Sequence, residues 1–237
     1  LDNNHIKKSK FKELMKSNFS KNHLIILGAN TKETTDNNIK YYNSLIIIDN
    51  DINVVGEYNK LKLVPFGEFL PFEKVLKKIG LKKVTAGYNS FSKGNNKSII
   101  TLNFDKNEIN LLPLICYEII FPSLIRKKNN HFNFIINISE DAWFGESIGP
   151  HQHFAKAIFR SIESRSFTIR SANKGISAFI SPEGKILKTL KSTESGNIEI
   201  DLPIFKSKNT NMNRDLIFAL LLIVYAITFL ILKKFKL

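Results

Sequence analysis

Short runs of β-branched and other apolar residues recur along residues 1–204, separated by polar segments rich in Gly, Asn and Ser. Apolar runs of roughly four to eight residues between turn residues predict strands. Several of these runs are continuously apolar, which is typical of strands buried on both faces of a sheet. The predicted strands are His23–Gly28, Ser44–Asp49, Ser98–Phe104, Ile109–Cys116, Asn133–Ile138, Gly175–Ser181 and Asn197–Ile200.

Helical periodicity is clearest between His153 and Arg170. Apolar residues there recur at the spacing of one helix face: Phe154, Ala157, Ile158, Ile162 and Ile169. Residues 5–17 and 72–80 are weaker helix candidates, and Gly87–Ser98 is a predicted loop because of its Gly, Ser and Asn content. Alternating strands and helices without an internal repeat indicate one α/β domain.

The C-terminal end carries an uncharged run, LIFALLLIVYAITFLIL, from Leu216 to Leu232. About 17 residues is the lower limit for crossing a bilayer core, and a buried core helix is the alternative. We predict a transmembrane helix at 215–232, preceded by a linker at 205–214 and followed by a basic tail at 233–237. The tail lysines place that tail in the cytoplasm by the positive-inside tendency, and hence the domain on the opposite side.

The net charge of +14 is open to three interpretations: nucleic acid, an anionic membrane surface, or the Lys- and Asn-rich composition of an AT-rich genome. The basic residues are scattered, as at Lys7, Lys77 and Lys82. No aromatic-plus-basic platform for single strands is present. The membrane segment also argues against a nucleic-acid partner, so none is predicted.

Cys116 is the single cysteine, so no internal disulfide can form. A lone cysteine in an apolar run is commonly a small core residue. Its place at the end of a predicted strand also suits a nucleophile presented by a sharp turn, with the next backbone N–H as oxyanion donor. A thiol nucleophile requires a base or a nearby cation; the candidates are Lys60, Lys62, Glu68, Glu118 and the histidines.

Two other features are ambiguous from the residues alone. His151 and His153 flank Gln152, but two histidines without a third ligand are weak support for zinc, and we predict no metal or cofactor. Trp143, the only tryptophan, stands among Asp, Glu and Gly residues after a predicted strand. An ordinary core aromatic is the alternative to a functional residue at this position.

Three segments resemble the apolipoprotein N-acyltransferase family of the nitrilase superfamily, in the family's order and spacing. They are Tyr58–Pro71 (YNKLKLVPFGEFLP), Pro113–Pro122 (PLICYEIIFP) and Asn137–His153 (NISEDAWFGESIGPHQH). Tyr42–Ser44, Arg160–Arg170 and Asn173–Gly175 add weaker support. The sequence departs from the family at Glu140, where Asn is usual, and at Lys62, where His is frequent.

The resemblance implies a nitrilase-like four-layer α-β-β-α sandwich over residues 1–204 and a Glu-Lys-Cys triad. Carried over by position, Cys116 is the nucleophile, Lys60 the catalytic lysine and Glu68 an auxiliary glutamate. Tyr117 and Glu118 are the expected active-site neighbours that follow the nucleophile. The sites of substrate binding would include the loop that carries Trp143 and Phe144.

The family's activity implies transfer of an acyl chain from a membrane phospholipid, through a Cys116 thioester, to a lipidated N-terminal cysteine. The acceptor is the α-amino group of that diacylglyceryl-cysteine on an apolipoprotein, so both partners are embedded in a bilayer. The implied location is the bacterial inner membrane, with the catalytic domain on the periplasmic side.

The family's general-base glutamate belongs to a Trp-Pro-Glu-like motif that this chain lacks, since Glu13 and Glu33 have no such context. We therefore expect an N-terminally truncated domain that is inactive by itself. The alternatives are a membrane-tethered nitrilase-type amidase and a catalytically dead nitrilase-like module.

Overall fold

The structure is a computed structural model that describes residues 9–35, 38–72, 78, 90–95, 99–104, 107–125, 131–204 and 214–234. The chain divides into two compact units, Leu1–Ser207 and Lys208–Leu237, and each is described by itself.

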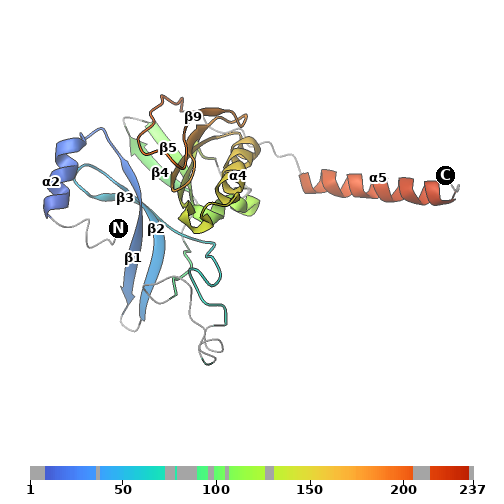
Figure 1. Ribbon diagram of the computed structural model, residues 1–237, viewed down its shortest axis with the longest axis horizontal. Coiled ribbons are helices and arrows are strands. Elements are labelled where there is room, and N and C mark those ends of the chain that lie inside the picture. Colours follow the sequence, from blue (N-terminus) through green and yellow to red (C-terminus); the bar gives the residue numbers. More distant parts are fainter. Residues whose placement is uncertain are drawn as a thin grey trace. The chain divides into compact units, whose positions relative to one another are not determined.

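The first unit contains two sheets among its described residues (Figure 1). The three-stranded sheet is antiparallel and runs in the order β1 (Ile25–Thr35), β2 (Asn38–Ile48) and β3 (Val54–Asn59). The six-stranded sheet runs in chain order through β4 (Ile100–Phe104), β5 (Asn107–Ile115), β6 (Phe134–Glu140), β7 (Phe167–Asn173), β8 (Ser177–Ile180) and β9 (Ile186–Leu190). Strands β5, β6 and β7 are parallel, and the remaining pairs of that sheet are antiparallel.

The alternation of side chains along β2 explains the layering. Leu45 and Ile47 are buried in the main core, together with apolar residues of the six-stranded sheet. Ile46 and Ile48 point to the other face, where they form a smaller cluster with Phe11 of helix α2, Ser9 to Asn18. A strand that is buried on both faces has a continuous run of apolar residues, as β2 does.

Helix α4 (Gly149–Ser164) packs on the other side of the domain, against β7 and the turn after β5. Its buried face includes Phe154 and Ala157, which belong to the main core. The helices and sheets described thus agree with the predicted four-layer α/β sandwich.

The predicted helix from His153 to Arg170 is wrong over its last six residues, 165–170. Helix α4 ends at Ser164, and Arg165 adopts the left-handed conformation, with φ 52° and ψ 41°. Residues 167–173 form β7, where Ile169 pairs with Ile136 of β6. Ile169 fits the helical spacing by coincidence, and no glycine marks the helix end, so the sequence pattern concealed the boundary.

The other strand predictions differ in detail. Strands β3 and β9 were not predicted, because both are short, largely exposed and interrupted by polar residues. The predicted strand at Asn197–Ile200 is wrong, since this segment has neither strand nor helix geometry. Apart from residues 72 and 78, the candidate helix at 72–80 lies outside the described residues. Half of the predicted loop at 87–98 is described, residues 90–95, and this part has no regular secondary structure.

The second unit is the helix α5 (Arg214–Lys234). Its side chains from Leu216 onward are exposed although most of them are apolar. The segment Leu216–Lys234 is long and apolar enough to cross a membrane, in agreement with the C-terminal span predicted at 215–232.

Candidate active site

The backbone turns sharply at the single cysteine. Strand β5 ends at Ile115, and Cys116 begins a short 3-10 helix, η2 (Cys116–Ile120). Cys116 has φ +50°, in the left-handed region that non-glycine residues rarely occupy, and its side chain is partly exposed. That conformation costs on the order of 1–2 kcal/mol, and such strain is common at functional sites.

A fully buried carboxylate, that of Glu118, lies beneath this turn. Its Oε1 accepts hydrogen bonds from the Tyr58 hydroxyl at 2.9 Å and from the backbone N–H groups of Leu61 at 2.7 Å and Lys62 at 2.9 Å. Its Oε2 accepts one from the Ile115 N–H at 2.9 Å. Glu118 therefore joins the cysteine turn to the segment that begins at residue 60.

Burial has the largest effect on the pKa values of Glu118 and Tyr58. Desolvation raises the pKa of Glu118 above its ordinary value, although the backbone N–H groups and the Tyr58 hydroxyl partly offset it. Burial and the neighbouring Glu118 carboxyl raise the pKa of Tyr58 far above its ordinary value. Tyr58 consequently acts as a hydrogen-bond donor.

The segment after β3 carries a buried lysine. Lys60 is 1% exposed, and its Nζ lies 2.8 Å from Oε1 of Glu68. Glu68 also accepts hydrogen bonds from Asn43 Nδ2 at 2.7 Å and from the Val64 N–H at 2.8 Å. A buried charged group requires a partner of opposite charge, and Glu68 supplies that partner and fixes the position of the Lys60 side chain.

Close backbone packing fixes the same segment from the other side. The Gly94 N–H donates to the carbonyl oxygen of Lys60 at 2.9 Å. A Cβ at Gly94 would lie 2.7 Å from the carbonyl carbon of Asn59, so this position requires glycine.

A second buried network, which the sequence did not predict, reaches the cysteine from the opposite side. His153 Nε2 lies 3.2 Å from the carbonyl oxygen of Cys116, and its Nδ1 lies 2.9 Å from Oδ1 of Asp141. Oδ2 of Asp141 accepts from Arg170 at 2.7 Å. Burial alone would raise the pKa of Asp141, but the His153 hydrogen bond and the Arg170 charge outweigh it, so that pKa lies below its ordinary value.

The histidine pair considered as a metal site is split by this arrangement. His153 is buried and bonded through both ring nitrogens, whereas His151 is exposed. Within the described ranges, no group of three or more His, Cys, Asp or Glu side chains is arranged to hold a metal ion.

Trp143 is not a core aromatic. It lies in the turn η4 (Asp141–Phe144) directly after β6, and 62% of it is exposed. Phe144 is 39% exposed, and its ring lies 5.5 Å from that of His153, centroid to centroid. An exposed apolar turn therefore lies beside the network that reaches the Cys116 carbonyl.

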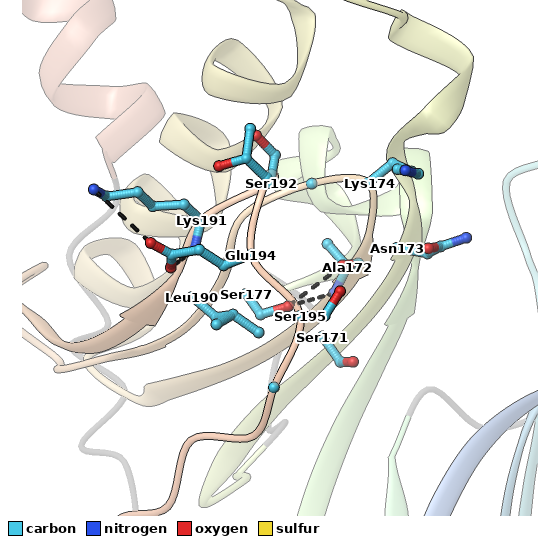
Figure 2. Close-up of a pocket in the computed structure, with 13 residues that line it drawn as sticks. Ser171, Ala172, Asn173, Lys174, Ser177, Leu190, Lys191, Ser192, Glu194 and Ser195 are labelled. Carbon is cyan, nitrogen blue, oxygen red and sulfur yellow. Dashed lines mark hydrogen bonds and ion pairs between the residues drawn. The ribbon is translucent and has the colours of Figure 1, made fainter.

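A hollow of about 390 Å³ opens at the ends of β7 and β9 (Figure 2). Its lining includes Asn173, Lys174 and the segment from Leu190 to Gly196. Asn173 donates to Glu140 Oε2 at 2.6 Å, at the base of the Trp143 turn. Neither Lys60 nor the cysteine lines this hollow, so it borders the candidate site without containing it.

Comparison with known proteins decides the family. Residues 4–205 match the carbon-nitrogen hydrolase family. The chain belongs to the carbon-nitrogen hydrolase family. Among solved structures, it is similar to an amidase of Nesterenkonia AN1 from the nitrilase superfamily, with a TM-score of 0.51, 15% identity, and coverage of 78% of this chain and 62% of the amidase. At this identity the likeness concerns the fold alone, and it confirms the predicted nitrilase-like fold.

Curated proteins named apolipoprotein N-acyltransferase are similar to the chain in sequence. The apolipoprotein N-acyltransferase of Allorhizobium ampelinum is 38% identical over 176 residues, which cover 74% of this chain and 33% of that protein. The apolipoprotein N-acyltransferase of Rhodopseudomonas palustris is 42% identical over 162 residues, which cover 68% of this chain and 30% of that protein. The chain thus spans about a third of the length of these relatives.

The remaining sequence candidates lie as follows. Tyr117 follows Cys116 and makes an edge-to-face ring contact with Phe121, at 4.9 Å between centroids. Glu13 is exposed on α2. Glu33, on β1, accepts a hydrogen bond of 2.6 Å from the Tyr42 hydroxyl, which raises the pKa of Tyr42 to about 12.

Proposed function

We propose that this chain supplies the nucleophile and the catalytic lysine of an apolipoprotein N-acyltransferase. One observation carries the proposal: Glu118 joins the strained turn of Cys116 to the segment that holds the buried Lys60–Glu68 pair. A nucleophile and a fixed cation thereby belong to one rigid unit, as covalent catalysis requires. Curated relatives that are 38% and 42% identical to the chain bear the name of this activity.

The first half-reaction forms an acyl-enzyme. The Cys116 thiol loses its proton to a carboxylate base and attacks the ester carbonyl carbon of a phospholipid. A carbon–sulfur bond forms, the ester carbon–oxygen bond breaks, and the lysophospholipid leaves with a proton. Lys60 and the Tyr117 N–H stabilise the oxyanion of the intermediate, and one such donor contributes about 3–4 kcal/mol.

The second half-reaction transfers the chain. The α-amino group of a diacylglyceryl-cysteine at the N-terminus of an apolipoprotein attacks the thioester carbonyl. An amide bond forms, the carbon–sulfur bond breaks, and the proton lost by the amine returns the thiol of Cys116. Every group in these steps belongs to the protein or its substrates, so the reaction needs no cofactor.

The membrane provides both substrates. The apolar helix α5 anchors the chain in the bacterial inner membrane. Its C-terminal Lys233 and Lys234 support, by the positive-inside tendency, a cytoplasmic C-terminal end and a periplasmic catalytic domain. The exposed Trp143 and Phe144 give an acyl chain an apolar contact beside the nucleophile.

A two-product assay tests the proposal in the full membrane protein that contains this chain. Vesicles hold a phospholipid with a labelled acyl chain and a diacylglyceryl-cysteine peptide. The proposal predicts label in the amide of the peptide and none in free fatty acid beyond the level of the Cys116→Ser variant. Label released mainly as free acid would instead indicate transfer to water, as in a hydrolytic amidase. No Cys116-dependent product would indicate a catalytically dead module.

A further inference from the structure

A series of hydrogen bonds begins at the backbone carbonyl group two residues before the nucleophile. The carbonyl oxygen of Leu114 accepts from Asn137 Nδ2 at 2.8 Å. The amide oxygen of Asn137 accepts from Arg170. These residues lie side by side on the parallel strands β5, β6 and β7, because Leu114 pairs with Asn137 and Asn137 pairs with Arg170 in the sheet register.

The same series of hydrogen bonds ends at the backbone carbonyl group of the nucleophile itself. Arg170 donates to Asp141 Oδ2 at 2.7 Å, and Asp141 Oδ1 bonds His153 Nδ1 at 2.9 Å. His153 Nε2 then lies 3.2 Å from the carbonyl oxygen of Cys116. A carbonyl oxygen can only accept, so Nε2 is the donor of this bond.

These hydrogen bonds form a closed ring, and the four side chains in it are all buried. Asn137 and Asp141 are 0% exposed, Arg170 is 2% exposed and His153 is 5% exposed. Buried ion pairs of this kind are weak contributors to stability, because desolvation offsets their attraction. Their value here lies in geometry, since a fully satisfied buried network specifies one arrangement.

The conformation of Cys116 is what this arrangement fixes. A non-glycine residue at φ +50° persists only where its surroundings over-determine it. Glu118 holds the N–H of Ile115, before the cysteine, and His153 holds the carbonyl oxygen of the cysteine itself. Without the hydrogen bond from His153, the backbone of Cys116 would relax toward an ordinary φ. The thiol would then move away from the oxyanion donors.

We propose that His153, anchored by Asp141 and Arg170, is a positioning residue that holds the carbonyl group of Cys116 and so keeps the thiol directed at the acyl carbonyl. His153 acts through the nucleophile and does not touch the substrate. The inference rests on the proposed function, because it takes Cys116 as the acyl-bearing residue.

Two amide variants isolate the bond to Cys116. In His153→Gln the side-chain nitrogen replaces Nε2 and can still donate to the Cys116 carbonyl. In His153→Asn it replaces Nδ1, so the bond to Asp141 is kept and the bond to Cys116 is lost. The single-turnover rate of Cys116 acylation is measured with labelled phospholipid in vesicles, in the full membrane protein. A displaced reacting group costs on the order of tenfold to a hundredfold, so His153→Asn is expected to acylate at least about tenfold more slowly than His153→Gln.

A second measurement separates positioning from loss of folding. Alkylation of Cys116 by iodoacetamide needs an accessible thiolate but no donor to an acyl oxygen, and its rate is expected to differ less than about threefold between the two variants. The donor concentration at half-maximal rate should also be unchanged, because His153 does not bind the donor. Ser161→Ala is the matched control: Ser161 is buried on the same helix and bonds Thr168 Oγ1 at 2.6 Å instead of the nucleophile.

Each outcome is decisive. Equal acylation of His153→Gln and His153→Asn overturns the inference, and so does a parallel fall of acylation and alkylation. If His153→Asn does not fold, Asp141→Asn must show the same selective loss of acylation, or the inference is wrong. If the wild-type protein takes up no acyl chain on Cys116, the proposed function fails first, and that result is distinct from a failure confined to the His153 variants.

Discussion

The buried carboxylate of Glu118 accepts a hydrogen bond of 2.7 Å from the backbone N–H of Leu61, across a sequence separation of 57 residues. This contact brings the lysine segment to the cysteine turn. Because Leu61 follows Lys60 and Glu118 lies two residues after Cys116, one side chain joins the segments that carry the proposed lysine and the proposed nucleophile.

Replacing this carboxylate by an amide should loosen both segments. Glu118→Gln turns its NH₂ group toward at least one of the donors from Tyr58, Leu61, Lys62 and Ile115, and an unsatisfied buried group costs about 1–3 kcal/mol. A loss near the middle of that range lowers Tm by roughly 4–8 °C in a domain of this size. Thermal unfolding in detergent checks this, with Glu108→Gln, an exposed glutamate of β5, as control. Equal Tm values for both variants would contradict the role of Glu118.

The Lys60–Glu68 pair predicts a strong energetic coupling. Glu68→Gln leaves the buried Lys60 ammonium without its charge partner, which costs about 3–5 kcal/mol. Lys60→Met removes the charge, so the double variant should be more stable than Glu68→Gln alone. Additive stability losses in this double-mutant cycle would show that the pair is not an interacting unit.

Loss of the lysine should affect chemistry more than folding. Lys60→Met removes one oxyanion donor and should lower the acylation rate by about a hundredfold to a thousandfold. Lys156→Met, at an exposed lysine on α4, is the matched control and should leave the rate unchanged. Single-turnover acylation measures both, and a rate of Lys60→Met within twofold of wild type would remove Lys60 from the catalytic machinery.

The substitution Gly175→Ala tests the buried ring of hydrogen bonds through Asp141 without removing a functional group. A Cβ at Gly175 would lie 2.7 Å from Cγ of Asp141, so Gly175→Ala must displace that carboxylate. The expected result is an acylation rate at least about tenfold lower. At Gly196 a Cβ would meet only Leu190 Cδ1 at 3.8 Å, an ordinary contact, so Gly196→Ala should behave as wild type. Normal acylation by Gly175→Ala would show that the Asp141 position is not critical.

The lowered pKa of Asp141 predicts a pH dependence of stability. Its folded pKa lies below the unfolded value of about 3.9. Its contribution is therefore complete above the unfolded pKa and is lost as pH falls through the folded pKa. The stability difference between wild type and Asp141→Asn should shrink as the pH falls below about 4. Glu118 titrates in both proteins and cancels; a difference that grows on acidification would contradict this sign.

The apolar patterns predicted the α/β class and most buried strands, because those runs are long and both faces are covered. They could not reveal β7, since Ile169 continues the spacing of α4 and Arg165 ends that helix without a glycine. The edge strand β9 is difficult to recognise because it is only five residues long and largely exposed, with polar residues between its apolar ones.

The candidate site was predictable only in part. The family resemblance indicated Lys60, Glu68 and Cys116, and the structure shows the first two paired and the third tied to their segment by Glu118. The role of His153 could not be predicted, because its partners Asp141 and Arg170 meet only through the register of three parallel strands and one turn. The sequence shows an apolar strand followed by the polar residues Ser139, Glu140 and Asp141, but it does not show which residues of the neighbouring strands lie beside them.

The central claim is that Cys116 carries the acyl chain, and intact-mass analysis of the full membrane protein tests it most directly. After incubation with a phospholipid of defined acyl chains and no acceptor, the account predicts a mass increase of one acyl group, located on the peptide containing Cys116 and released by hydroxylamine. The same adduct should be absent from Cys116→Ser. An acyl adduct that persists in Cys116→Ser, or wild-type turnover without any adduct on that peptide under acceptor-free conditions, would contradict the account.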